Sequence, residues 1–93
     1  MALTTPEVEI EELDTITTDH PAKVILFNDN VHSFDEVIVQ LIKAVHCSSD
    51  RAESYAMEVH TKGKACVYSG EWDECIRVSS ILEEIALHTQ IEM

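Results

Sequence analysis

Residues 22–34 read AKVILFNDNVHSF, and this stretch places an apolar strand directly before a capped helix. The run AKVILFN is apolar and β-branched, which predicts a largely buried strand over residues 22–28. Ser33 is followed three residues later by Glu36, the pattern of a capping box. Apolar residues then recur at the spacing of one helix face, which predicts a helix over residues 34–46. A β-to-α transition therefore opens the fold.

The loop between these two elements carries three consecutive polar side chains, Asn28, Asp29 and Asn30. A chain that only needs to turn can do so with two residues and a glycine. The three side chains together present several oxygen acceptors, so two interpretations stay open: a polar turn or a binding loop. Whether these oxygens only stabilise the turn or bind a ligand determines the function of the chain.

The rest of the chain continues the alternation of helices and strands. The patterns predict a helix over 50–61, a strand over 64–69 (KACVYS), a helix over 71–87 and a strand over 89–93 (TQIEM). Ser48 or Ser49 can cap the second helix, and Gly63 supplies the left-handed residue that ends it. The order predicts an α+β sandwich in which three helices cover a three-stranded sheet.

Length and charge restrict the possible partners. A chain of 93 residues forms one domain and offers no deep catalytic cleft between domains. Six Lys and Arg oppose 18 Asp and Glu, a formal charge of -12, so we expect no nucleic acid and no membrane as a partner. Residues 1–21 contain acids and no base, which predicts a disordered acidic extension before a folded domain over 22–93.

Cysteine usage and the N-terminus indicate a reducing compartment. Cys47, Cys66 and Cys75 form an odd set without C-x-x-C spacing, so we expect three buried free thiols and no metal site. The N-terminus lacks the basic and apolar regions of a signal peptide, and no apolar run reaches 18 residues. We therefore expect a cytoplasmic protein that needs no cofactor.

No catalytic pattern stands out along the chain. It has no glycine-rich phosphate loop, no G-x-S-x-G elbow and no H-E-x-x-H, which predicts that it is not an enzyme. One polar feature remains beside the loop: His60, in MEVHTKGKA, at the end of the second predicted helix. It is either a surface histidine that interacts with the helix dipole or a ligand-binding residue.

Two stretches considered together resemble a known family. KVILFNDN, residues 23–30, and EVHTKGKA, residues 58–65, are similar to the two signature stretches of the ClpS family of protease adaptors. The similarity extends from Lys23 to the last helix and weakens after Val67, where this chain has a shorter segment. It implies an antiparallel sheet with the order β-α-α-β-α-β.

The resemblance also implies a function. A ClpS adaptor recognises the N-terminal residue of an N-degron protein, usually Leu, Phe, Tyr or Trp, and transfers that protein to a Hsp100 unfoldase, ClpA or ClpC, of the Clp protease. It carries a flexible N-terminal extension that the unfoldase engages during the transfer. The expected partners are therefore N-degron proteins and the N-terminal domain of the unfoldase, with the adaptor as a monomer. A free α-amino group is a cation with three donors, which suits an acidic protein.

The resemblance assigns a site to named residues. The N-terminal amine is assigned to Asn28, Asp29, Asn30 and His60. The hydrophobic side-chain pocket is assigned to Leu26, His32, Phe34, Val37, Ala56 and Val59, of which all but His32 could equally be core residues. Contact with the unfoldase is assigned to Glu71 and Arg77, which could equally be solvated helix charges.

This chain departs from the family at several of these positions. Asn30 stands where an aspartate is common, Phe34 and Ala56 stand where methionines are common, and His32-Ser33 replaces Thr-Pro. Hydrogen bonds between charged groups are worth about 1.5–3 kcal/mol against about 1 for a neutral pair, so Asn30 predicts a weaker amine site. A second interpretation is therefore a ClpS-like regulatory protein that docks on the unfoldase without recognising N-degrons.

Overall fold

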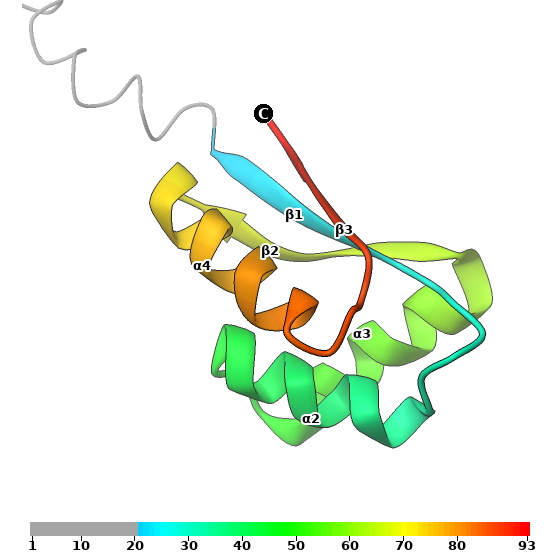
Figure 1. Cartoon of the computed structure of the whole chain (residues 1–93). Coiled ribbons are helices and arrows are strands. Elements are labelled where there is room, and N and C mark those ends of the chain that lie inside the picture. The colour runs from blue at the N-terminus through cyan, green and yellow to red at the C-terminus, as the bar shows by residue number, and fades with distance from the viewer. Residues whose placement is uncertain (1–20) are drawn as a thin grey trace, which may run out of the picture.

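The computed structural model describes residues 21–93, and Figure 1 shows their arrangement. The elements are β1 (Ala22–Phe27), α2 (Phe34–Val45), α3 (Ser49–Lys62), β2 (Lys64–Gly70), α4 (Trp72–Glu83) and β3 (Thr89–Glu92). This order confirms the predicted β-α-α-β-α-β fold. The predicted acidic extension, residues 1–21, lies outside the described residues apart from Pro21. Within residues 21–93, no helix has the length and apolar composition needed to cross a bilayer.

The sheet has β1 at its centre. Its strand order is β2-β1-β3, and both neighbours run antiparallel to β1. Ala22 pairs with Gly70 at one end of β1, and Phe27 pairs with Lys64 at the other. The three helices lie on one side of this sheet (Figure 1). Val24 and Leu26 of β1 are fully buried in the core beneath them.

Side chains and backbone carbonyls close the helix ends much as the sequence predicts. The Ser33 hydroxyl accepts from the Glu36 backbone N–H, and the Glu36 carboxylate accepts from the Ser33 backbone N–H, so the capping box is present. Of the two candidates for α3, Ser48 is the N-cap, since its hydroxyl accepts from the Arg51 N–H. Gly63 ends α3 with a left-handed φ of 91°.

The third helix is shorter than the predicted range of 71–87. It ends at Glu83 because the chain reverses through Ala86, whose φ is 67°. The Ala86 N–H donates to the Glu83 carbonyl at 2.9 Å, and the Leu87 N–H donates to the Leu82 carbonyl at 3.4 Å. These two bonds form a Schellman motif, which normally places a glycine at the left-handed position. Alanine at that position gave no sequence signal for the helix end.

The prediction of three buried thiols is wrong for two of the cysteines. Cys75 is buried, Cys47 is half-buried and Cys66 is exposed. Cys66 lies in β2 between Ala65 and Val67, which are both buried. Because successive side chains of a strand point to opposite faces, burial of these neighbours places Cys66 on the face without helices. Alternation of side chains along the strand KACVYS could have predicted that Cys66 is exposed if Ala65 and Val67 are buried.

Candidate functional site

A cavity of about 530 Å³ lies at the end of β1, between the loop that follows it, the start of α2 and the second half of α3. Every residue that the resemblance assigns to amine or side-chain binding lines this cavity. They are Leu26, Asn28, Asp29, Asn30, His32, Phe34, Val37, Ala56, Val59 and His60. The fold therefore brings together two stretches that are far apart in the sequence.

A backbone hydrogen bond fixes the loop to the end of α3. The Asn28 N–H donates to the Gly63 carbonyl at 2.9 Å, immediately beyond the strand pair Phe27 and Lys64. His60 stands about one turn before Gly63, so this bond brings His60 and Asn28 to the same cavity. The side chains of Asn28, Asn30 and His60 are exposed, and within residues 21–93 no hydrogen bond engages them. Their polar atoms are available to a ligand.

Asp29 differs from its neighbours because its carboxylate is bonded within the loop. Oδ1 accepts from the backbone N–H groups of Val31 and His32, each at 3.0 Å. Oδ2 lies 2.7 Å from His32 Nδ1. Burial opposes ionisation, but the hydrogen bonds from His32 and Val31 outweigh it and lower the pKa of the Asp29 carboxyl. Asp29 therefore shapes the loop as an ionised carboxylate.

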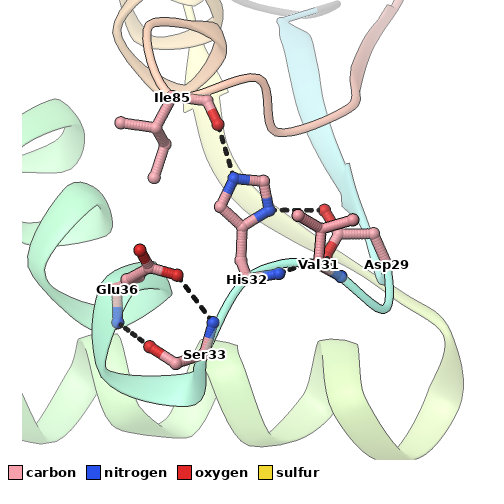
Figure 2. A network of polar contacts seen from close by, with 6 residues as sticks. All are labelled: Asp29, Val31, His32, Ser33, Glu36 and Ile85. Atoms are coloured by element: carbon pink, nitrogen blue, oxygen red, sulfur yellow. Dashed lines mark hydrogen bonds and ion pairs between the residues drawn. The ribbon is translucent and has the colours of Figure 1, made fainter.

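His32 connects this loop to the other end of the chain. Its Nδ1 contacts Asp29, and its Nε2 contacts the backbone carbonyl of Ile85, which follows α4 (Figure 2). The hydrogen bond to Asp29, and then the one to Ile85, raise the pKa of His32, although burial acts in the opposite direction. The imidazole is therefore a structural link as well as part of the cavity wall.

The apolar part of the cavity wall overlaps with the hydrophobic core. Leu26, Ala56 and Val59 are buried and belong to both, whereas Phe34 and Val37 are half-buried at the start of α2. The two interpretations of these residues, pocket or core, are therefore compatible. An apolar side chain that enters the cavity would pack against residues that are also part of the hydrophobic core.

Four further residues line the cavity without having been predicted: Phe27, Ser33, Met57 and Leu87. Phe27 and Ser33 adjoin predicted site residues, a signal that could have identified them. Met57 is 47% exposed and follows Ala56 on α3. Leu87 is the last residue of the Schellman motif, in a segment that the sequence predicted to be helical. Its position on the wall could not be inferred without the correct end of α4.

The two residues assigned to the unfoldase contact lie away from the cavity. Glu71 is exposed and precedes α4, next to Gly70, whereas the cavity lies at the opposite end of β1. Arg77 donates to the Glu74 carboxylate at 2.9 Å and to the Ala44 carbonyl at 3.1 Å. Arg77 therefore connects α4 to the end of α2 while remaining partly exposed.

Comparison with known proteins identifies the family. A family model described as ATP-dependent Clp protease adaptor protein ClpS matches residues 17–91. The ATP-dependent Clp protease adapter protein ClpS of Corynebacterium glutamicum is 35% identical over 72 residues, which cover 77% of this chain and 72% of that protein. The structure of Agrobacterium tumefaciens ClpS2 bound to L-phenylalaninamide superposes with a TM-score of 0.73 and 24% identity, covering 78% of this chain and 95% of that one.

A human ligase contains a similar segment. E3 ubiquitin-protein ligase UBR2 of Homo sapiens is 31% identical over 71 residues, which are 76% of this chain but only 4% of the ligase. The similarity to the ligase thus concerns one small part of a much longer protein. The family model, in contrast, spans nearly all of the described residues. This chain belongs to the ClpS family of ATP-dependent Clp protease adaptors.

Proposed function

We propose that this chain binds the N-terminal residue of a substrate protein, through its free amine and a bulky hydrophobic side chain, and delivers that protein to a Clp unfoldase. One observation carries the proposal: exposed polar residues and buried apolar residues line the same cavity. The Agrobacterium tumefaciens ClpS2 structure contains L-phenylalaninamide, a ligand with a free amine and an aromatic side chain. The cavity described here suits a ligand of the same chemistry.

The amine would bind at the polar part of the wall. A protonated α-amine has three N–H donors, and the amide oxygens of Asn28 and Asn30 together with a ring nitrogen of His60 could accept them. All three side chains are exposed on the cavity. Asp29 adds negative charge beside them, and the formal charge of -12 favours a cationic ligand over an anionic one.

The substrate side chain would bind at the apolar part of the wall. The volume of about 530 Å³ falls within the range of about 300–1,000 Å³ that is typical of small-ligand pockets. Leu26, Ala56 and Val59 offer a buried base, and Phe34 and Met57 offer bulk nearer the opening. A large aliphatic or aromatic residue would therefore be preferred to a small or charged one.

The unfoldase would bind at the other end of the domain. Glu71 and Arg77 of the α4 region are candidates for contact with the N-terminal domain of ClpA or ClpC. Glu71 is exposed and adjoins the β1 end that lies away from the cavity. This separation supports simultaneous binding of substrate and unfoldase by a monomeric adaptor.

A second candidate function is docking on the unfoldase without recognition of N-degrons. Two observations favour it. The carboxylate of Asp29 is already occupied by His32 and by the loop backbone. Asn30 replaces the aspartate that is common in the family, so the loop has no second carboxylate for the amine.

One comparison separates the two candidates. Fluorescence anisotropy would measure binding of a labelled peptide with a free N-terminal Leu and of its N-acetylated twin. Acetylation removes the charge of the amine and leaves the side chain unchanged. Binding of the free peptide alone supports recognition of N-degrons. Equal binding, or no binding of either, together with capture by ClpA or ClpC in a pull-down, supports the second function.

A further inference from the structure

The imidazole of His32 faces two groups that can only accept hydrogen bonds. Nδ1 lies 2.7 Å from Asp29 Oδ2, and Nε2 contacts the carbonyl oxygen of Ile85 (Figure 2). An ionised carboxylate and a backbone carbonyl have no proton to donate. A neutral imidazole has one N–H, whereas an imidazolium has two. Both contacts can therefore be hydrogen bonds only when His32 is protonated.

The contact with Ile85 joins the loop after β1 to the turn after α4, and residues of both segments line the cavity. Asp29 and His32 belong to the loop between β1 and α2, while Ile85 lies 53 residues beyond His32 in the sequence. Leu87, two residues after Ile85, lines the cavity as well. The His32 side chain is only 9% exposed, so water has little access to replace either bond. His32 thus adds a side-chain bond between the loop and the turn after α4, beyond the backbone bond from the Phe27 N–H to the His88 carbonyl at 3.0 Å.

We propose that His32 is a protonated clamp, a positioning residue that holds the amine-binding loop against the turn after α4 and so keeps the cavity assembled. The clamp deepens the function proposed above and rests on it where ligand binding is concerned. Asp29 is the second member of the clamp, because its carboxylate holds the imidazole of His32 through Nδ1. Threonine, which the resemblance implies is common in the family at position 32, has no imidazole and cannot make both contacts.

The charges around His32 favour its protonated form. Asp29 in the loop and Glu36 in the first turn of α2 are the acidic groups that act on it. On the α4 side, Glu84 bonds to Lys43 and Glu83 bonds to Thr89, while His60 of α3 lines the same cavity. The bonds to Asp29 and Ile85 raise the pKa of His32 above its ordinary value of 6.5, against the effect of burial.

The sign of the pH dependence follows from this raised pKa. The clamp is complete below the ordinary pKa of 6.5 and is lost as pH rises through the higher pKa of folded His32. The carboxylate is the stronger acceptor, so the remaining N–H stays on Nδ1 and the contact of Nε2 with Ile85 opens. High pH should therefore release the α4 turn from the loop while the contact with Asp29 persists.

The first test is an NMR titration of the protein without ligand between about pH 5 and about pH 9. We expect protons on both ring nitrogens of His32 at low pH and a ring pKa above 6.5. The backbone amides of Ala86 and Leu87 should shift with the same midpoint. They should stay unchanged through that range in His32→Asn, whose amide nitrogen can replace Nδ1 but cannot reach Ile85. If the amide shifts of Ala86 and Leu87 do not change as His32 titrates, the clamp is refuted.

The second test compares peptide affinity across the same pH range. Relative to His32→Asn, the parent should bind a free N-terminal Phe peptide about tenfold more tightly at low pH, with the ratio falling towards one at high pH. Effects of pH on the peptide and on the unchanged part of the chain are shared by both proteins and cancel in this ratio. His32→Gln, which retains only a donor near Nε2, should also lack the pH step, whereas the exposed His46→Asn should behave like the parent.

The outcomes distinguish the clamp from the proposed function. A ratio that does not change with pH would overturn the clamp even if the peptide binds. Absence of peptide binding at every pH, with turn amides that follow His32, would refute N-degron recognition and support the clamp. Circular dichroism of each variant at both pH extremes would show that the fold is intact. If His32→Asn does not fold, the NMR titration of the parent decides alone.

Discussion

At the scale of single residues, two exposed polar side chains from different elements carry the proposed amine contact. Asn28 follows β1 and His60 lies in the last turn of α3, and both line the cavity. We expect Asn28→Ala and His60→Ala each to weaken binding of a free N-terminal Leu or Phe peptide by more than about tenfold. Each change leaves one amine N–H of the bound peptide without its protein acceptor.

Fluorescence anisotropy would measure this loss, and circular dichroism would check that the fold is intact. Glu53→Ala is a suitable control, since Glu53 is exposed on α3 and does not line the cavity. Alanine is also compatible with a helix, so this control leaves α3 undisturbed. If both site variants bind like the parent, the amine binds elsewhere and the proposed mechanism fails.

Ala56 determines how much space the apolar wall leaves for the substrate side chain. It is only 3% exposed and lies at the base of the cavity, where family members commonly carry methionine. Ala56→Met would fill part of this space, so we expect affinity for an N-terminal Trp to fall relative to Leu. One or two methylenes of pocket volume are worth about 1–3 kcal/mol, so the ranking should shift without complete exclusion.

Anisotropy with four peptides that differ only in an N-terminal Leu, Phe, Tyr or Trp would measure this ranking. Equal losses for all four peptides would indicate a general disturbance of the cavity. An unchanged ranking would mean that position 56 does not contact the bound side chain.

At the scale of elements, local patterns were sufficient for most boundaries. The capping box at Ser33, the left-handed Gly63 and the strand AKVILFN each depend on residues close together in sequence, and the structure confirms them. Features that depend on distant contacts were not predictable. The bond from His32 to the Ile85 carbonyl spans 53 residues, and the sequence gives no local indication of it. The same is true of Leu87 on the cavity wall.

The end of α4 was mispredicted for a physical reason that can be tested. Ala86 occupies the left-handed position of the Schellman motif at φ 67°, where an alanine side chain is strained and glycine is not. We expect Ala86→Gly to stabilise the domain by about 0.5–1 kcal/mol, after allowing for the larger backbone entropy of glycine in the unfolded chain. Urea unfolding followed by circular dichroism would measure the shift in midpoint.

A matched control places glycine where the backbone is ordinary. Ser80 is exposed within α4, so Ser80→Gly should destabilise the domain by about 0.5 kcal/mol. Opposite signs for the two glycine variants would support strain at position 86. Destabilisation by both would show that the left-handed alanine costs little in this turn.

At the scale of the whole molecule, the proposed substrate site and the proposed unfoldase site lie at opposite ends of β1. Glu71 is exposed and adjoins Gly70, which pairs with Ala22, whereas the cavity begins beyond Phe27. We expect Glu71→Lys to weaken capture by ClpA or ClpC in a pull-down and to leave peptide affinity unchanged. Asp50→Lys, a charge reversal at the start of α3, is the control for the change in net charge. Equal capture of both variants and the parent would remove Glu71 from the contact.

The described part of the chain begins at this same end of β1. Pro21 precedes Ala22, which pairs with Gly70, the residue before Glu71. Residues 1–21, which lead to β1, contain six acids and no base. We propose that the unfoldase engages this segment during delivery, because tethering it beside a docked surface raises its local concentration.

A chain that begins at His20 tests this proposal. We expect it to fold, to bind a free N-terminal Leu peptide and to be captured by ClpA or ClpC as the full chain is, since the cavity and Glu71 are retained. Degradation of an N-degron reporter by the reconstituted protease should, however, fall to the level seen without adaptor. A second full-length variant, in which the six acids of this segment are changed to their amides, separates the effect of charge from that of length. It should still deliver the reporter if the unfoldase needs only the length of the segment and not its charge. Full degradation with the shortened chain would show that the segment has no part in delivery.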